Sequence, residues 1–113
     1  MGLANAIIFE DVVLGVTVDA LTSVLTLDTR MLKNVSITFK NTGINSCVLR
    51  VTTRTKNGGA IPTIEVNDIT ITAGSTFRYF SSHFLAETII SLRSSAVGVP
   101  TTYSIEYTYE KNR

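Results

Sequence analysis

Apolar and polar residues alternate along most of this chain with a period of two. In residues 34–40, Val35, Ile37 and Phe39 share one face, and polar side chains occupy the other. This alternation is typical of a β-strand with one buried face, because successive side chains of a strand point to opposite sides. The pattern therefore predicts a strand over residues 34–40 whose apolar face packs into a core.

The same alternation recurs along the chain, with turn signals between the runs. Gly43, Asn57-Gly58, Gly74 and Gly98 lie in these interruptions, and Asn-Gly is suited to the positive φ angles of a tight hairpin. We count about eight strands by this criterion. The others are expected over residues 12–18, 25–28, 47–52, 69–72, 77–79, 88–93 and 103–109.

Helical patterns are nearly absent, and this decides the fold class. Only residues 81–87 resemble a helix, and they are too short to be stable without tertiary support. Closely spaced strands without crossover helices indicate an antiparallel sandwich or barrel. A jelly roll and an immunoglobulin-like sandwich both fit, although the Cys and Trp pair of a true immunoglobulin domain is missing. We expect an all-β, antiparallel β-sandwich of about eight strands, jelly-roll-like.

Length and charge limit the organisation and the partners. The 113 residues fit one domain, 1–113, in which residues 1–14 are a candidate amino-terminal arm. The formal charge of +1 supplies no general field for nucleic acid or an anionic membrane. No apolar run approaches the roughly 20 residues of a membrane span, and the start lacks the basic region of a signal peptide. We expect no nucleic-acid or membrane partner.

Candidate catalytic and metal-binding groups are few. His83 is the single histidine, and no partner signature for catalysis accompanies it. Cys47 is the single cysteine and lies in a strand-like run, which favours a buried thiol acting as a small apolar side chain. The nine acidic residues form no Asp-x-Asp calcium pattern. We expect no catalytic residue, metal, cofactor or small-molecule ligand.

Two features exceed this background. The segment Ala6-Ile7-Ile8-Phe9 is apolar on both faces of any strand and is followed at once by two acids. It is either an interior strand or an arm that adds to a neighbour's sheet edge. The strands also carry little of the charge that normally discourages edge pairing, which favours association. The predicted assembly interface comprises Ala6, Ile7, Ile8, Phe9, Val12 and Leu14.

Three stretches carry a family resemblance. Residues 35–43, residues 69–75 and the closing strand at 103–109 resemble, in strand and turn style, small jelly-roll subunits of bacterial surface or spore appendages and of phage particles. The resemblance implies a homo-oligomeric filament or shell held by edge pairing and apolar burial. Spore-appendage subunits usually carry cysteines in an amino-terminal connector, whereas residues 1–14 have none. This difference argues against disulfide cross-links and leaves strand addition.

A carbohydrate-binding module is the alternative from another class. Such a module needs exposed aromatic platforms, and this chain has no Trp. Tyr103, Tyr107 and Tyr109 share a strand face with Ile105, which is typical of a core or an interface. A non-catalytic structural subunit is therefore the preferred interpretation.

Overall fold

The computed structural model describes residues 6–28, 32–54, 63–80 and 87–112, with side chains for all of these except 6–9, 33, 111 and 112. The described residues form eight β-strands, as the alternation predicts, and none of them lies in a helix that could cross a membrane. The expected turn at 56–59 and residues 81–86 of the helix candidate lie outside the described residues. The strands are β1 (Ala6–Val16), β2 (Thr22–Asp28), β3 (Leu32–Asn41), β4 (Cys47–Arg54), β5 (Thr63–Ile71), β6 (Thr76–Phe80), β7 (Glu87–Ser94) and β8 (Thr102–Asn112).

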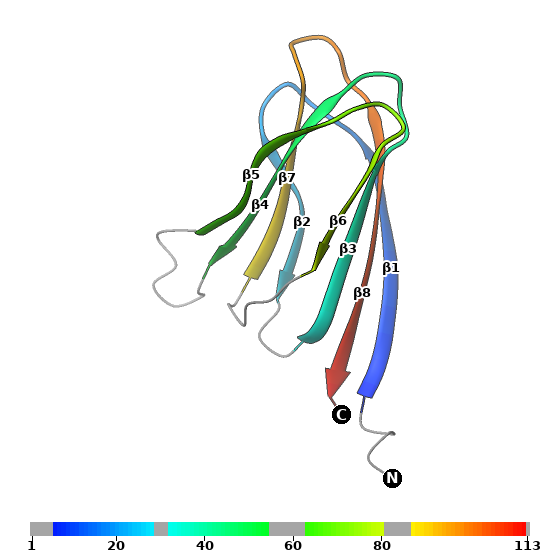
Figure 1. Ribbon diagram of the computed structural model, residues 1–113, viewed down its shortest axis with the longest axis vertical. Helices are drawn as coiled ribbons and strands as arrows, with labels where there is room; N and C mark the ends of the chain where they lie inside the picture. The colour runs from blue at the N-terminus through cyan, green and yellow to red at the C-terminus, as the bar shows by residue number, and fades with distance from the viewer. Residues whose placement is uncertain (1–5, 29–31, 55–62, 81–86, 113) are drawn as a thin grey trace.

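The strands pair like one long hairpin folded over on itself. β1 pairs with β8, β2 with β7, β3 with β6 and β4 with β5, and every pair is antiparallel. Further pairing of β3 with β8 and of β4 with β7 produces two four-stranded sheets. Sheet A has the order β1-β8-β3-β6 and sheet B the order β2-β7-β4-β5 (Figure 1). This nested pairing is a jelly roll, so the expected sandwich is confirmed and its connectivity is settled.

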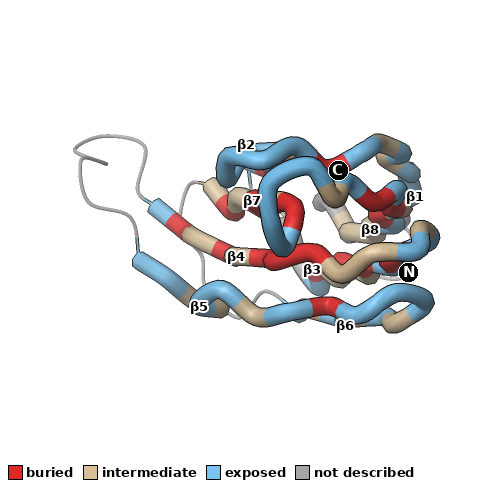
Figure 2. The backbone as a smooth tube through the Cα atoms, turned by 90° about the horizontal axis from the view of Figure 1, so that it is seen from above, coloured by how far each residue is buried: buried red, intermediate tan, exposed pale blue. Residues whose placement is uncertain are grey.

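The hydrophobic core lies between the two sheets. Ile37 and Phe39 of β3 are 2% and 1% exposed, and Leu49 and Val51 of β4 face them from sheet B at 1% and 0%. In an end view, buried residues follow the inner strands of both sheets (Figure 2). Burying a side chain of this size stabilises a fold by roughly 1.5–3 kcal/mol. The faces predicted for β3 and β4 are therefore correct.

A cluster of buried polar side chains, Thr17, Asn41, Ser94 and Thr101, fastens one end of the sandwich. Asn41 ends β3, and its Nδ2 donates a hydrogen bond of 3.0 Å to the Ile71 carbonyl in the opposite sheet. Its Oδ1 accepts a bond of 2.7 Å from the Thr101 hydroxyl. The Thr17 hydroxyl accepts from the Thr101 amide at 3.0 Å and lies 2.9 Å from the Ser94 hydroxyl. This end cluster joins both sheets by hydrogen bonds as well as by apolar packing.

A close approach at Gly15 fixes how β1 lies on the core. Gly15 pairs with Tyr103 of β8, and a Cβ placed on Gly15 would lie 2.7 Å from Tyr103 Cζ. The Tyr103 ring is 7% exposed and stacks on Phe39 with the ring centroids 5.9 Å apart. Only glycine leaves room for this ring, so the Gly15 side of β1 must face inward.

We predict that Asn41→Ala destabilises the domain by about 3 kcal/mol, because the substitution leaves buried partners in both sheets without their hydrogen bonds. Urea unfolding followed by circular dichroism measures the change. Asn67→Ala, at an exposed position of β5, is the matched control and should cost under about 0.5 kcal/mol. Equal unfolding midpoints for the two variants would show that the end cluster does not hold the sheets together.

Candidate assembly surface

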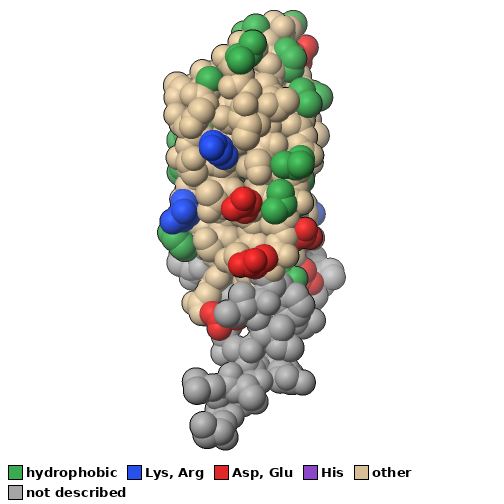
Figure 3. All heavy atoms as spheres, turned by 90° about the vertical axis from the view of Figure 1, so that its right-hand side faces the viewer, with side chains coloured by type: hydrophobic (Ala, Val, Ile, Leu, Met, Phe, Trp, Pro, Cys, Tyr) green, Lys and Arg blue, Asp and Glu red, His purple; other side chains and the backbone are tan. Residues whose placement is uncertain are grey.

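The outer face of β1 carries a row of exposed apolar side chains. Because Gly15 and Thr17 face inward, the alternate positions face the solvent. Val12, Leu14 and Val16 are 51%, 74% and 57% exposed, and Val18, just beyond the strand, is 53% exposed. We call Val12, Leu14, Val16 and Val18 the β1 apolar row. Figure 3 looks onto this side of the molecule and shows hydrophobic side chains along one border, with acidic groups lower in the view.

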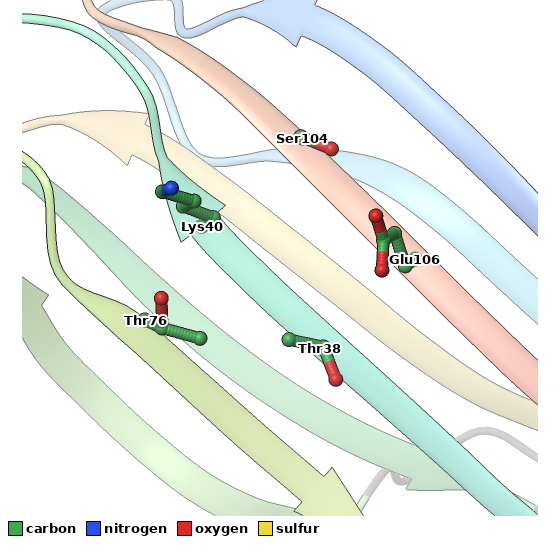
Figure 4. Close-up of a pocket in the computed structure, with 5 residues that line it drawn as sticks. All are labelled: Thr38, Lys40, Thr76, Ser104 and Glu106. Carbon is green, nitrogen blue, oxygen red and sulfur yellow. The ribbon is translucent and has the colours of Figure 1, made fainter.

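The strand next to this row is polar on the same face. Across the β1–β8 ladder, Val12 lies opposite Glu106, Leu14 opposite Ser104 and Val16 opposite Thr102. Further across sheet A is a shallow depression whose lining is made of hydroxyl groups and one charge of each sign (Figure 4). Its lining residues are Thr38, Lys40, Thr76, Ser104 and Glu106. The depression has no aromatic platform for a sugar ring.

The four sheet edges differ in how well they could accept another strand. β5 has irregular pairing with β4 and a positive φ of 36° at Asp68. β2 has a register shift between Ser23 and Leu25, and β6 is only five residues long. β1 is eleven residues long and pairs with β8 without any register shift. Bulges and short strands protect sheet edges from association, so β1 is the least protected by these devices.

The predicted interface residues all fall in β1. Val12 and Leu14 are exposed on its outer face. The backbone of residues 6–9 pairs with residues 109–112 of β8, while the side chains of 6–9 lie outside the described set. The segment is thus an edge strand of sheet A, neither flanked by strands on both sides nor detached from the domain. Its role in assembly stays a prediction.

Among the exposed apolar residues that sequence reasoning missed, three lie at or beside the two edges of sheet A. Val16 and Val18 belong to the β1 apolar row, and Phe80 at the end of β6 is 63% exposed. The alternation marks Val16 and Val18 as one face of a strand but does not say which face is inside. The glycine at position 15 was the available signal, since a glycine within a strand often marks a close approach.

Sheet B carries paired charges on its outer side. The Arg50 guanidinium donates to both carboxylate oxygens of Asp68, at 2.6 and 2.8 Å, and this hydrogen bonding lowers the pKa of Asp68. Arg54 donates to Glu87 at 2.5 Å. These ion pairs link neighbouring strands of one chain and leave sheet B less suited than β1 to bind an apolar surface.

The other residues considered for catalysis, metal binding or sugar binding are the single cysteine, the single histidine and the tyrosines of β8. Cys47 is fully buried, which confirms the sequence prediction. His83 lies outside the described residues, and the part of the chain that is described holds no group of three His, Cys, Asp or Glu side chains suited to a metal. Tyr107 and Tyr109 stack with ring centroids 6.3 Å apart and pack against the core, as Tyr103 does. The tyrosine face therefore packs against the core, with Tyr103 buried and Tyr107 and Tyr109 partly buried, and it does not form an exposed platform for a sugar.

Comparison with known proteins places the fold. No protein-family model matches this sequence, and no curated protein matches it. A solved structure from Bacillus endospore appendages, described as a novel family of disulfide-linked pili, superposes with a TM-score of 0.64 at 8% identity, over 96% of this chain and 88% of that one. The crystal structure of PirA superposes with a TM-score of 0.59 at 12% identity, over 88% and 92% of the two chains. The resemblance to an appendage subunit is confirmed at the level of the fold.

We predict that the Cys47 thiol does not react in the folded protein. Burial raises its pKa to about 11, so at pH 8 only about one molecule in a thousand carries the reactive thiolate. A chromogenic disulfide reagent should give no signal at pH 8 until urea unfolds the chain, and then one equivalent. Full reaction within minutes in buffer alone would contradict the burial of this side chain.

Proposed function

We propose that this protein is a non-catalytic structural subunit that self-assembles into an ordered filament or shell. The observation that carries the proposal is the β1 apolar row, which lies on the longest and most regular edge strand of the domain. Covering a half-exposed valine or leucine contributes roughly 1 kcal/mol, and an edge strand adds backbone hydrogen bonds to this. The β1 edge thus offers both apolar surface and unpaired backbone groups, and these are the two contributions that drive strand addition.

The fold comparison supports the same class of function. The spore-appendage protein that shares this fold belongs to pili described as disulfide-linked. The single cysteine of the present chain is buried, so its assembly would be non-covalent, held by edge pairing and apolar contacts. The natural partners are other copies of the chain or neighbouring subunits of an appendage or particle at a cell, spore or phage surface. Residues 6–14 would contribute to that interface.

We predict that placing charge on the β1 apolar row abolishes assembly without unfolding the domain. Val12→Lys combined with Leu14→Lys removes apolar surface from the row and places two charges, which are costly to desolvate, in any interface that covers it. Electron microscopy and sedimentation velocity at micromolar concentration measure the loss of polymers. Both side chains are largely exposed, so urea unfolding should shift by less than about 1 kcal/mol.

The matched control is Val97→Lys, because Val97 is a comparably exposed apolar residue, at 83%, outside the strands. We expect this variant to assemble like the parent protein. A parent protein that remains a monomer at all concentrations reached would refute the structural role, and polymers unchanged in the double lysine variant would refute the role of β1.

A further inference from the structure

The two edges of sheet A are oriented so that copies of the protein could continue the sheet. β1 and β6 lie at opposite ends of the strand order β1-β8-β3-β6, as the end view shows (Figure 2). Each neighbouring pair in this order is antiparallel, so β1 and β6 run in opposite directions. A second copy displaced along the sheet without turning would therefore place its β6 antiparallel to β1 of the first. The pairing needs no symmetry axis.

The side chains on the two edges complement each other in charge and in apolar surface. Arg78 and Phe80 of β6 pair with Thr38 and Ser36 and lie on the outer face of sheet A, the face that also carries Glu10 and the β1 apolar row. Arg78 Nε donates only a long bond of 3.3 Å, to the Thr38 hydroxyl, within the described part of the chain. Neither Arg78 nor Glu10 forms an ion pair with another described residue. Each edge thus presents an exposed charge of opposite sign beside exposed apolar surface.

The ladders of sheet A also supply the register. Val12, Glu106, Thr38 and Arg78 lie in one row across the four strands. Continuing this row places Arg78 of the next copy opposite Val12, with Phe80 opposite Glu10 and Thr76 opposite Leu14. Arg78 is then diagonal to Glu10, a separation of about 7–8 Å that a long side chain can span. The five residues of β6 cover the part of β1 where its acid and its apolar row meet.

We infer that β1 of one copy pairs with β6 of the next, so that sheet A runs unbroken through successive copies. This inference rests on the proposed assembly function and names the surface that completes it. The contact is head-to-tail, because two different edges meet, and such contacts continue indefinitely unless rotation closes a ring. Each copy adds four strands, or about 19 Å at the usual strand spacing, and strand twist turns the stack into a helix.

The same displacement has a consequence for sheet B. It brings β2 of one copy beside β5 of the next, and these strands also run in opposite directions. The register shifts in both strands and the positive φ of Asp68 leave this second pairing irregular. Sheet A therefore provides most of the contact between copies, and sheet B contributes fewer regular backbone hydrogen bonds.

Cysteine cross-linking tests the pairing directly, because the native Cys47 is buried and is not expected to react with the cross-linker. A chain carrying both Val12→Cys and Thr76→Cys keeps Arg78 and places the two cysteines diagonally across the inferred contact, about 7–8 Å apart. Treated with a short bis-maleimide at assembling concentration, it should give a ladder of covalent multimers on a denaturing gel. Each single-cysteine variant should remain a monomer, since its cysteine faces a strand without one. Covalent dimers from Val12→Cys alone would show β1 meeting β1 and would overturn the inference.

Charge exchange tests the same contact without added thiols. Glu10→Arg and Arg78→Glu, each alone, should raise the concentration needed for polymers about tenfold, which corresponds to roughly 1.4 kcal/mol per contact. The double exchange should restore assembly to within about threefold of the parent. Restoration is the decisive readout, because a variant that merely misfolds would not be rescued by a second substitution, and urea unfolding of each variant checks this point.

The outcomes separate the inference from the proposed function. If the parent protein forms polymers but the double-cysteine chain gives no ladder, the β1–β6 pairing is wrong while the structural role stands. The pairing is also wrong if the double charge exchange fails to restore polymers. If the parent protein forms no polymers, both the structural role and the pairing are refuted.

Discussion

The close packing of Gly15 under Tyr103 determines which face β1 turns to the solvent. With Gly15 inward, Thr17 also points inward and reaches the end cluster, where it meets Thr101 and Ser94. The period of a strand then directs the β1 apolar row outward, because a slip of one residue exchanges the two faces completely. Such a slip would bury the valines, but it would bring a side chain against the Tyr103 ring and remove a hydroxyl from the end cluster. The exposed row is thus a result of how this strand fits its core.

Much of the fold could be predicted from the alternation, because most strands are defined by residues that are close together in the sequence. In residues 34–40 of β3, one set of alternate positions is wholly apolar and the other wholly polar, so both the strand and its buried face follow from a few neighbouring residues. β1 is different, because each of its two sets of alternate positions combines apolar residues with an acid: Asp11 belongs to the set of Val13, and Glu10 to the set of Val12. Its orientation depends on Tyr103, which is distant in sequence. Val12 and Leu14 stand out in the sequence because they follow an apolar segment, whereas Val16, Val18 and Phe80 require the strand partners to be known.

The two sheets handle their exposed surfaces differently. Sheet B closes its outer side with the ion pairs Arg50–Asp68 and Arg54–Glu87, and its edges are interrupted by register shifts. Exposed ion pairs of this kind contribute little to stability, generally under about 1 kcal/mol each. Their effect is to occupy charges that would otherwise face a partner. Sheet A keeps a long regular edge on one side and an arginine beside an exposed phenylalanine on the other, so the surfaces that we propose for association both lie in one layer.

The nested pairing of strands also orders events during synthesis. β1 is made first among the described strands, yet its ladder partner β8 is made last, so the two can meet only after the intervening strands have left the ribosome. Until then Gly15 cannot pack against Tyr103, and the outer face and edge of β1 are not yet formed. A nascent chain would therefore lack this surface until β8 has been synthesised, and any contact made through the β1 edge could form only after β1 and β8 have paired.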